Sequence, residues 1–289
     1  MLIPIGDINP VRRTPWVMRL LILANVAAFL LVEPFGTCAR QQFFLDWAAV
    51  PAELWQGRPL GVGEVAALAG SSECLLTAAP DKPVYGAVLF SMFFHADLLH
   101  LGFNMLFLWV FGNNVEDFFG SMRFAAVYLL CGVIGTAAFA AANPEGTLTL
   151  VGASGAVAGV LGSYLLLHPT ARVTVVVLPL IFLAFQLPAL VVLGAWFLLQ
   201  LREVGGQVVS GGGVAYLAHV AGFVGGFVVT AAWGGRPQRR RRRPPPGGPP
   251  GDEPPRSPQA TRRCHGNRAS TRASARRYMG CSARAQASL

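Results

Sequence analysis

The sequence contains few charged residues, and this shortage limits the class of protein. Asp, Glu, Lys and Arg make up 13% of its 289 residues, whereas 53% are hydrophobic. Soluble domains usually carry about 25% charged residues, so this composition excludes an ordinary soluble globular protein. Apolar runs long enough to cross a bilayer recur between residues 17 and 233. They indicate a multi-pass protein whose solvent is the lipid bilayer.

The sequence also lacks the patterns of a metal centre and of a cleavable signal peptide. Its five cysteines are scattered without metal-ligand spacing. His95 and His100 are five residues apart, which places their rings about 140° apart on a helix. No small-residue cleavage site follows the first apolar run, which we therefore expect to be a retained span. We expect neither a metal nor a cofactor.

The net charge of +9 comes from the C-terminal segment alone. Residues 1–235 carry 9 Lys and Arg against 12 Asp and Glu, whereas residues 236–289 carry 14 Arg and 2 acids. Because 236–289 is rich in Arg, Pro, Gly, Ala and Ser and has almost no apolar residue to bury, we expect a disordered tail. Its arginines show no repeated interleaving with aromatic residues and no folded basic module accompanies them, so we expect no nucleic-acid partner.

Six apolar segments predict six membrane spans. They cover roughly residues 16–32, 98–115, 123–142, 153–168, 180–201 and 214–233. Arginines flank these segments on one side of the predicted membrane, so the positive-inside rule places both termini in the cytoplasm. The sequence thus predicts an all-α membrane protein with a short cytoplasmic N-terminus (1–15), a six-helix domain (16–235) and a basic cytoplasmic tail. The Arg- and Pro-rich composition favours a bacterial cell membrane.

The long connection at 33–97 is unusually apolar for a loop. It includes Trp47 and Trp55, and amphipathic aromatic residues prefer the membrane interface. We therefore expect this first extracytoplasmic loop to lie partly in the outer leaflet. Cys38 and Cys74 would face an oxidising compartment there, and the sequence is compatible both with a disulfide between them and with two free thiols.

Among the polar side chains inside the predicted spans, four stand out. His100 and Asn104 lie in the second span, Ser154 in the fourth and His219 in the sixth. Polar groups in a bilayer are costly, roughly 2.5–3.5 kcal/mol for a central charge, so those that persist indicate a functional site. The three spans run from outside to inside in the predicted topology, which places all four residues near the outer end of the bundle.

Small residues recur at helical spacing beside two of these polar groups. Gly155 and Gly159 are four apart in the fourth span, and Gly222 and Gly226 are four apart in the sixth. Such residues let membrane helices approach closely. We therefore expect the fourth and sixth spans to pack backbone to backbone, which brings Ser154 Oγ within reach of the His219 ring.

A hydroxyl beside an imidazole is an arrangement suited to nucleophilic catalysis. The imidazole takes the serine proton during attack and returns it to the leaving amine. Ser154 opens a predicted helix, whose free N–H groups favour negative charge, and His100 and Asn104 can donate to an oxyanion. The sixth span contains no Asp or Glu, so we predict a Ser–His dyad. Taken singly, GASG is typical of helix packing and Asn104 of helix association.

Several motifs resemble those of the rhomboid intramembrane proteases. They are HADLLHLGFNM at 95–105, NNVEDFFG at 113–120, GASG at 152–155 and AHVAGFVGG at 218–226, and the resemblance covers about residues 15–235. It implies Ser154 as nucleophile, His219 as general base, and an oxyanion hole of His100, Asn104 and the Ser154 N–H. It also implies single-span membrane-protein substrates cleaved near the outer face, with the fifth span as a lateral gate and 205–213 as a mobile cap.

One position departs from the family pattern. Many relatives carry an aromatic residue four positions after the nucleophile, where it stacks on the base, but here that position is Ala158. The orientation of His219 must therefore have another origin. Two other functions compete with the protease: a rhomboid-like pseudoenzyme that binds or escorts membrane proteins, and a small transporter. The sequence leaves the oligomeric state open.

Overall fold

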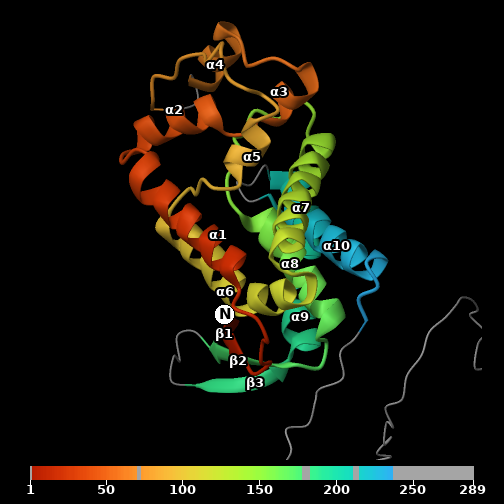
Figure 1. The fold of residues 1–289 in the computed structure, drawn as a ribbon. Coiled ribbons are helices and arrows are strands. Elements are labelled where there is room, and N and C mark those ends of the chain that lie inside the picture. Colours follow the sequence, from red (N-terminus) through yellow and green to blue (C-terminus); the bar gives the residue numbers. More distant parts are fainter. Residues whose placement is uncertain (1, 70–72, 178–182, 211–214, 237–289) are drawn as a thin grey trace, which may run out of the picture. The chain divides into compact units, whose positions relative to one another are not determined.

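The protein is mostly helical in a computed structural model that describes residues 2–69, 73–177, 183–210 and 215–236 (Figure 1). The predicted tail lies outside the described residues, apart from Arg236. The helices are α1 (Trp16–Ala27) with its π-helical continuation η1 (Ala28–Val32), α2 (Thr37–Trp47), α3 (Pro51–Gln56), α4 (Val62–Ala69), α5 (Ala87–Ser91), α6 (Leu98–Phe119), α7 (Ser121–Ala142), α8 (Ser154–Leu167), α9 (Ala189–Ser210) and α10 (Tyr216–Ala232).

Five of the six predicted spans correspond closely to helices of the structure. Helices α6 and α7 are each long and apolar enough to cross a membrane, while Trp16–Val32, α8 and α10 are shorter apolar helices. Helix α8 lies among α6, α7, α9 and α10, and most of its 14 residues are buried. A helix that is apolar on every side belongs in the interior of a bundle. The number of membrane crossings remains a prediction.

The predicted boundaries of the fifth span, 180–201, are wrong. Strand β3 (Ala184–Pro188) occupies its first part, and α9 begins only at Ala189. Pro188 has no amide hydrogen and disfavours helix in the residue before it, so the helix starts after the proline. Helix α9 also continues to Ser210, so the start of the segment 205–213 is helical rather than a cap loop. The rest of that segment lies outside the described residues.

A small antiparallel sheet departs from the all-α prediction. Its strands β1 (Leu2–Asp7), β2 (Arg172–Val177) and β3 are arranged in the order β1-β2-β3. Four of the six residues of β2 are valine and one is threonine, and such β-branched residues favour strands. The sheet lies at one end of the helical bundle, and α2 to α5 lie at the other (Figure 1). It joins the N-terminal segment to the connection between α8 and α9.

Partly buried hydrogen bonds connect β1 to the bundle. The Tyr164 hydroxyl donates to Asp7 Oδ2 at 2.6 Å, and Asn114 Nδ2 donates to the same oxygen at 2.9 Å. Burial raises the pKa of the Asp7 carboxyl from 3.8 to about 6, although these hydrogen bonds oppose the shift. The sheet is thereby connected to α8 through Tyr164 and to α6 through Asn114.

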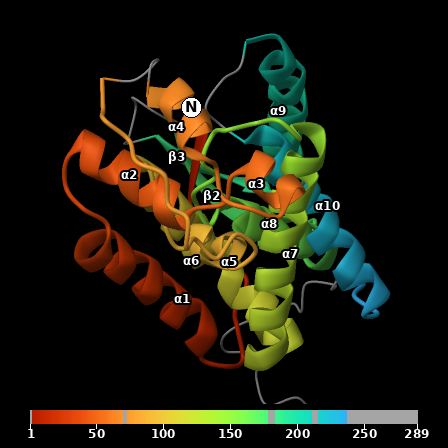
Figure 2. The ribbon, with the colours of Figure 1, turned by 90° about the horizontal axis from the view of Figure 1, so that it is seen from above.

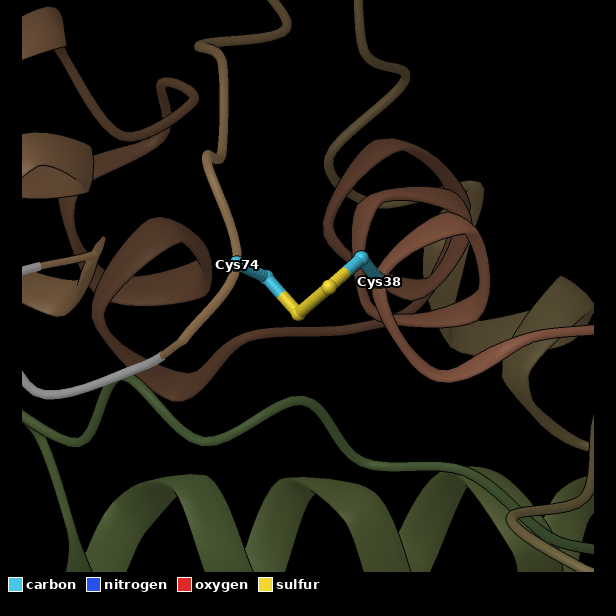
Figure 3. The surroundings of a disulfide bond; sticks show 2 residues. All are labelled: Cys38 and Cys74. Carbon is cyan, nitrogen blue, oxygen red and sulfur yellow. A yellow bond between two sulfur atoms is a disulfide. The ribbon is translucent and has the colours of Figure 1, made fainter.

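The segment 33–97 forms a structured subdomain over the other end of the bundle. A disulfide joins Cys38 in α2 to Cys74 in the segment after α4 (Figure 3), so the structure selects the bonded alternative of the two that the sequence allowed. Lys82 Nζ and Glu53 Oε2 form a buried ion pair at 2.6 Å. The apolar cluster within this segment is small, and short segments bury too little apolar surface to be stable alone. The disulfide and the ion pair therefore help to hold the segment together.

The raised pKa of Asp7 predicts a pH-dependent contribution to stability. In the folded protein the carboxyl binds a proton more tightly than the reference value of 3.8 implies. Its contribution is therefore fully present below about pH 4 and is lost as the pH rises through about 6. An asparagine cannot ionise, so Asp7→Asn does not lose this contribution as the pH rises. We expect the free energy of unfolding of Asp7→Asn, minus that of the wild type, to be larger at pH 7.5 than at pH 4.5. Between these two pH values the difference in unfolding free energy should grow by about 2 kcal/mol.

Denaturant titrations of both proteins in the same detergent micelles, across this pH range, measure the difference. Use of the difference cancels the other titrating groups, which the two proteins share. A difference in unfolding free energy that does not vary with pH contradicts the prediction.

Candidate active site

Ser154 is the first residue of α8, and the segment before it is fixed by the 33–97 subdomain. The Gly152 N–H donates to the Ser91 carbonyl at 2.9 Å, and the Leu150 N–H donates to the Ala49 carbonyl at 2.8 Å. The Ser91 hydroxyl lies 2.6 Å from the Ala49 nitrogen, which donates to it. The serine therefore lies at the end of the bundle that carries 33–97, opposite the sheet.

His219 contacts this serine directly. The ring lies in the first turn of α10, and its Nε2 is 2.8 Å from Ser154 Oγ. This separation is that of a hydrogen bond between a hydroxyl and a ring nitrogen. The structure thus brings together the two side chains that we predicted to meet.

Glycines make this contact sterically possible. A Cβ on Gly222 would overlap the Gly155 carbonyl, and a Cβ on Gly226 would overlap the Gly159 carbonyl. Helices α8 and α10 therefore touch along their backbones, as the spacing of small residues indicates. Figure 2 shows α7, α8 and α10 side by side. Helix α7 joins the same contact through Gly135, where a Cβ would lie 2.7 Å from the Ala218 carbonyl oxygen.

His100 lies against the loop that leads to Ser154. Gly152 has a φ of +123°, and a Cβ there would lie 2.7 Å from both Cε1 and Nε2 of His100 and 3.6 Å from Ser154 Oγ. Position 152 must therefore be glycine for two reasons, its backbone conformation and the closeness of the imidazole. Nε2 of His100 and the serine hydroxyl both lie close to the same point.

Asn104 lies one turn further along α6. Its side chain is buried, and its Nδ2 donates to the His100 carbonyl at 2.9 Å. An amide group has two hydrogens, so this bond uses one of them. Asp97 caps the start of α6 by accepting from the His100 N–H at 2.8 Å. The cap and the amide together hold the first two turns of α6, which carry both candidate oxyanion donors.

Two contacts of His219 come from α9, and we did not predict them. Its Nδ1 is 2.8 Å from Gln200 Oε1, and its ring stacks on Trp196 with centroids 6.2 Å apart and planes 30° apart. Ala158 is buried in the packing of α8. A signal existed in the sequence: Gln200 is a polar residue near the end of the predicted fifth span, four positions after Trp196 and so on the same helix face.

Among the described residues, no group of three or more His, Cys, Asp or Glu side chains could hold a metal ion. His95 and His100 do approach each other, with ring centroids 5.2 Å apart. Taken together, the contacts around Ser154 provide a hydroxyl, an imidazole and nearby hydrogen-bond donors. Acyl transfer requires this set of groups.

Comparison with known proteins identifies the family. The family model for the Rhomboid domain matches residues 83–236, more than half of the chain, and the chain therefore belongs to the rhomboid family of membrane proteins. This confirms the family that the sequence motifs indicate.

Similar proteins include Rhomboid protein 1, mitochondrial, of Saccharomyces cerevisiae, 33% identical over 144 residues, which cover 47% of this chain and 38% of that protein. Rhomboid protease GluP of Bacillus subtilis is 31% identical over 140 residues, covering 48% and 24%. The human presenilin-associated rhomboid-like protein, mitochondrial, is 33% identical over 107 residues, covering 35% and 27%. The chain thus matches well under half of each relative's length. Because two of the three are mitochondrial, they do not support the predicted bacterial cell membrane.

The backbone contact between α8 and α10 predicts a strong effect of added side chains. In Gly226→Ala the new methyl group meets the Gly159 backbone, which cannot move aside as a side chain can. We expect a loss of stability on the order of 1–3 kcal/mol or more, as for other overpacked interiors. Thermal unfolding in detergent micelles, followed by circular dichroism, measures it.

Gly194→Ala is the matched control. Gly194 lies in α9, and nothing lies within 4 Å of a Cβ built there, so alanine should be neutral or slightly stabilising. Equal unfolding temperatures for the two variants would contradict the proposed close packing.

Proposed function

We propose that the protein is an intramembrane serine endopeptidase that hydrolyses peptide bonds of transmembrane substrates through a Ser154–His219 dyad. The observation that carries the proposal is the 2.8 Å contact between Ser154 Oγ and His219 Nε2. Membership of the rhomboid family supports it, as does the printed name of one relative, Rhomboid protease GluP. The proposal needs no metal or cofactor.

The dyad divides hydrolysis into two steps. In the first, His219 Nε2 takes the hydroxyl proton while Ser154 Oγ attacks the substrate carbonyl carbon. The tetrahedral intermediate collapses when the imidazolium gives that proton to the leaving amine, which leaves an ester on Ser154. In the second step, a water molecule gives its proton to His219 and attacks the ester, and the acid product leaves as the serine regains its proton.

The negative charge of the intermediate needs donors on one side of the serine. The start of α8 supplies the Ser154 N–H at the positive end of the helix dipole. His100 borders Gly152 beside the hydroxyl, and Asn104 lies a turn further along α6. We assign these three groups to the oxyanion hole, where a fixed donor contributes on the order of 3 kcal/mol to transition-state stabilisation.

The depth of the site indicates the kind of substrate. Ser154, His219 and His100 all lie in the first turn of their helices, at the end of the bundle that carries 33–97. With both termini in the cytoplasm, this is the outer membrane face, where water is available. We therefore propose single-span membrane proteins as substrates, entering beside α9 and cut near that face.

A rhomboid-like pseudoenzyme is the second candidate. It would bind or escort membrane proteins without cleaving them. The hydrogen-bonded pair of Ser154 and His219 favours the protease, because a binding protein has no need of an imidazole aligned on a hydroxyl.

Ser154→Ala is expected to abolish cleavage of a transmembrane reporter by the purified full chain in liposomes. Removal of the nucleophile should lower kcat by about 10³-fold or more. Ser121→Ala makes the same change at the first residue of α7, at the end of the bundle away from the dyad, and should cleave like the wild type. Equal cleavage by wild type and Ser154→Ala would refute the protease. Binding of the reporter without cleavage by either would support the pseudoenzyme.

His100→Ala and Asn104→Ala test the oxyanion hole. We expect kcat to fall by about 10²-fold for each, since an oxyanion donor acts mainly in the transition state. KM for the reporter should change little. Wild-type kcat in both variants would remove these residues from the proposed site, without affecting the roles of Ser154 and His219.

A further inference from the structure

We infer that Gln200 is a positioning residue that selects the catalytic tautomer of His219, and that Trp196 fixes the plane of the imidazole. The inference rests on the proposed function and deepens it. In a catalytic triad an acid orients the histidine, but α10 contains no Asp or Glu. The inference assigns this orienting role to residues of α9.

The contact of Gln200 determines which nitrogen of His219 carries the proton. A carboxamide oxygen can only accept a hydrogen bond. Gln200 Oε1 lies 2.8 Å from His219 Nδ1, and a hydrogen bond between these two atoms requires the proton of the neutral ring to be on Nδ1. Nε2 then presents its lone pair, and that nitrogen is the one 2.8 Å from Ser154 Oγ.

The alternative tautomer would be inactive. With its proton on Nε2, the ring would donate to Ser154 Oγ and could not take the hydroxyl proton. Its Nδ1 would then present a lone pair, and the Gln200 carboxamide would have to turn over so that its Nε2–H group, in place of Oε1, faced the ring. The orientation in the structure, with Oε1 facing Nδ1, matches the tautomer able to act as a base. The contact also strengthens when the ring becomes an imidazolium, since a charged donor makes a stronger hydrogen bond.

An aromatic stack fixes the plane of the ring. Trp196 lies over His219, and it also packs against Phe223 with centroids 6.0 Å apart. Phe197 stacks on Phe223 at 4.6 Å. Trp196 and Gln200 are four apart on α9, as are His219 and Phe223 on α10, so two matching helix faces meet. Trp196 thus supplies the stacking ring that is missing at Ala158.

A neutral amide suits this position better than a carboxylate would. The site lies among apolar helices, where a further charge is expensive. Gln200 provides an acceptor for the imidazole without adding that charge. The expected consequence is a base that is oriented by its surroundings rather than by an ion pair.

The first test is the kinetics of reporter cleavage by the full chain in liposomes. Gln200→Leu keeps a similar volume but removes the acceptor, and we expect kcat to fall by about 10- to 100-fold with KM within about twofold. Gln200→Glu restores an acceptor oxygen at the same place and should recover most of the lost kcat. Gln56→Leu makes the same substitution at an exposed glutamine in α3, and it should leave both constants unchanged.

The second test observes the tautomer itself and needs no variant at position 200. Nitrogen-15 spectra of histidine-labelled wild type distinguish a protonated Nδ1 from a protonated Nε2, and His219→Gln identifies the signal. We expect the Nδ1–H form in the wild type and a share of the Nε2–H form in Gln200→Leu. A wild-type ring protonated on Nε2 would overturn the inference, even if Gln200→Leu failed to fold.

The outcomes separate this inference from the function on which it rests. If the wild type cleaves, Ser154→Ala does not, and Gln200→Leu has wild-type kcat, then the positioning role is wrong and the protease stands. If kcat falls in Gln200→Leu and is not recovered in Gln200→Glu, then Gln200 does not act as a hydrogen-bond acceptor for His219, and the inference is wrong. A wild type that leaves the reporter uncut refutes the protease, while the spectra still decide the tautomer.

Discussion

The contact between the backbones of α8 and α10 is the constraint on which the rest of the site depends. Packed helices ordinarily stand about 8–10 Å apart, with side chains filling the space between them. Here Gly222 meets Gly155 and Gly226 meets Gly159 with no side chain between them. This closeness lets the short side chain of Ser154 reach the His219 ring. Without these glycines, the hydroxyl and the imidazole would belong to separate helix surfaces.

Helix α8 is held by hydrogen bonds near both of its ends, and these bonds fix the position of its first residue, Ser154. At one end, Gly152 is hydrogen-bonded to the 33–97 subdomain. At the other, Tyr164 is hydrogen-bonded to Asp7 of the sheet. Between these ends the helix is surrounded by its neighbours and mostly buried. The small sheet is thus part of the scaffold, although it lies at the opposite end from the serine.

Helix α9 completes the arrangement from a third direction. Contacts with Ser154 use one nitrogen of His219, and contacts with Gln200 use the other. The imidazole therefore joins α8 to α9 through α10. If substrate enters beside α9, as the family resemblance implies, then the helix beside the entry is also the helix that contacts the base through Gln200 and Trp196. Entry of the substrate and readiness of the dyad would then be linked by one side chain.

By itself the sequence determined the family, five of the six apolar helices and the pairing of Ser154 with His219, because helical periodicity and the spacing of glycines are local properties of the chain. It misplaced the start of α9 and missed the sheet, because β2 is apolar like its neighbours and becomes a strand only by pairing with β1 and β3. Only the tertiary structure revealed Gln200 and Trp196. Their role depends on how α9 is rotated against α10, and no spacing within either helix specifies a rotation between two helices.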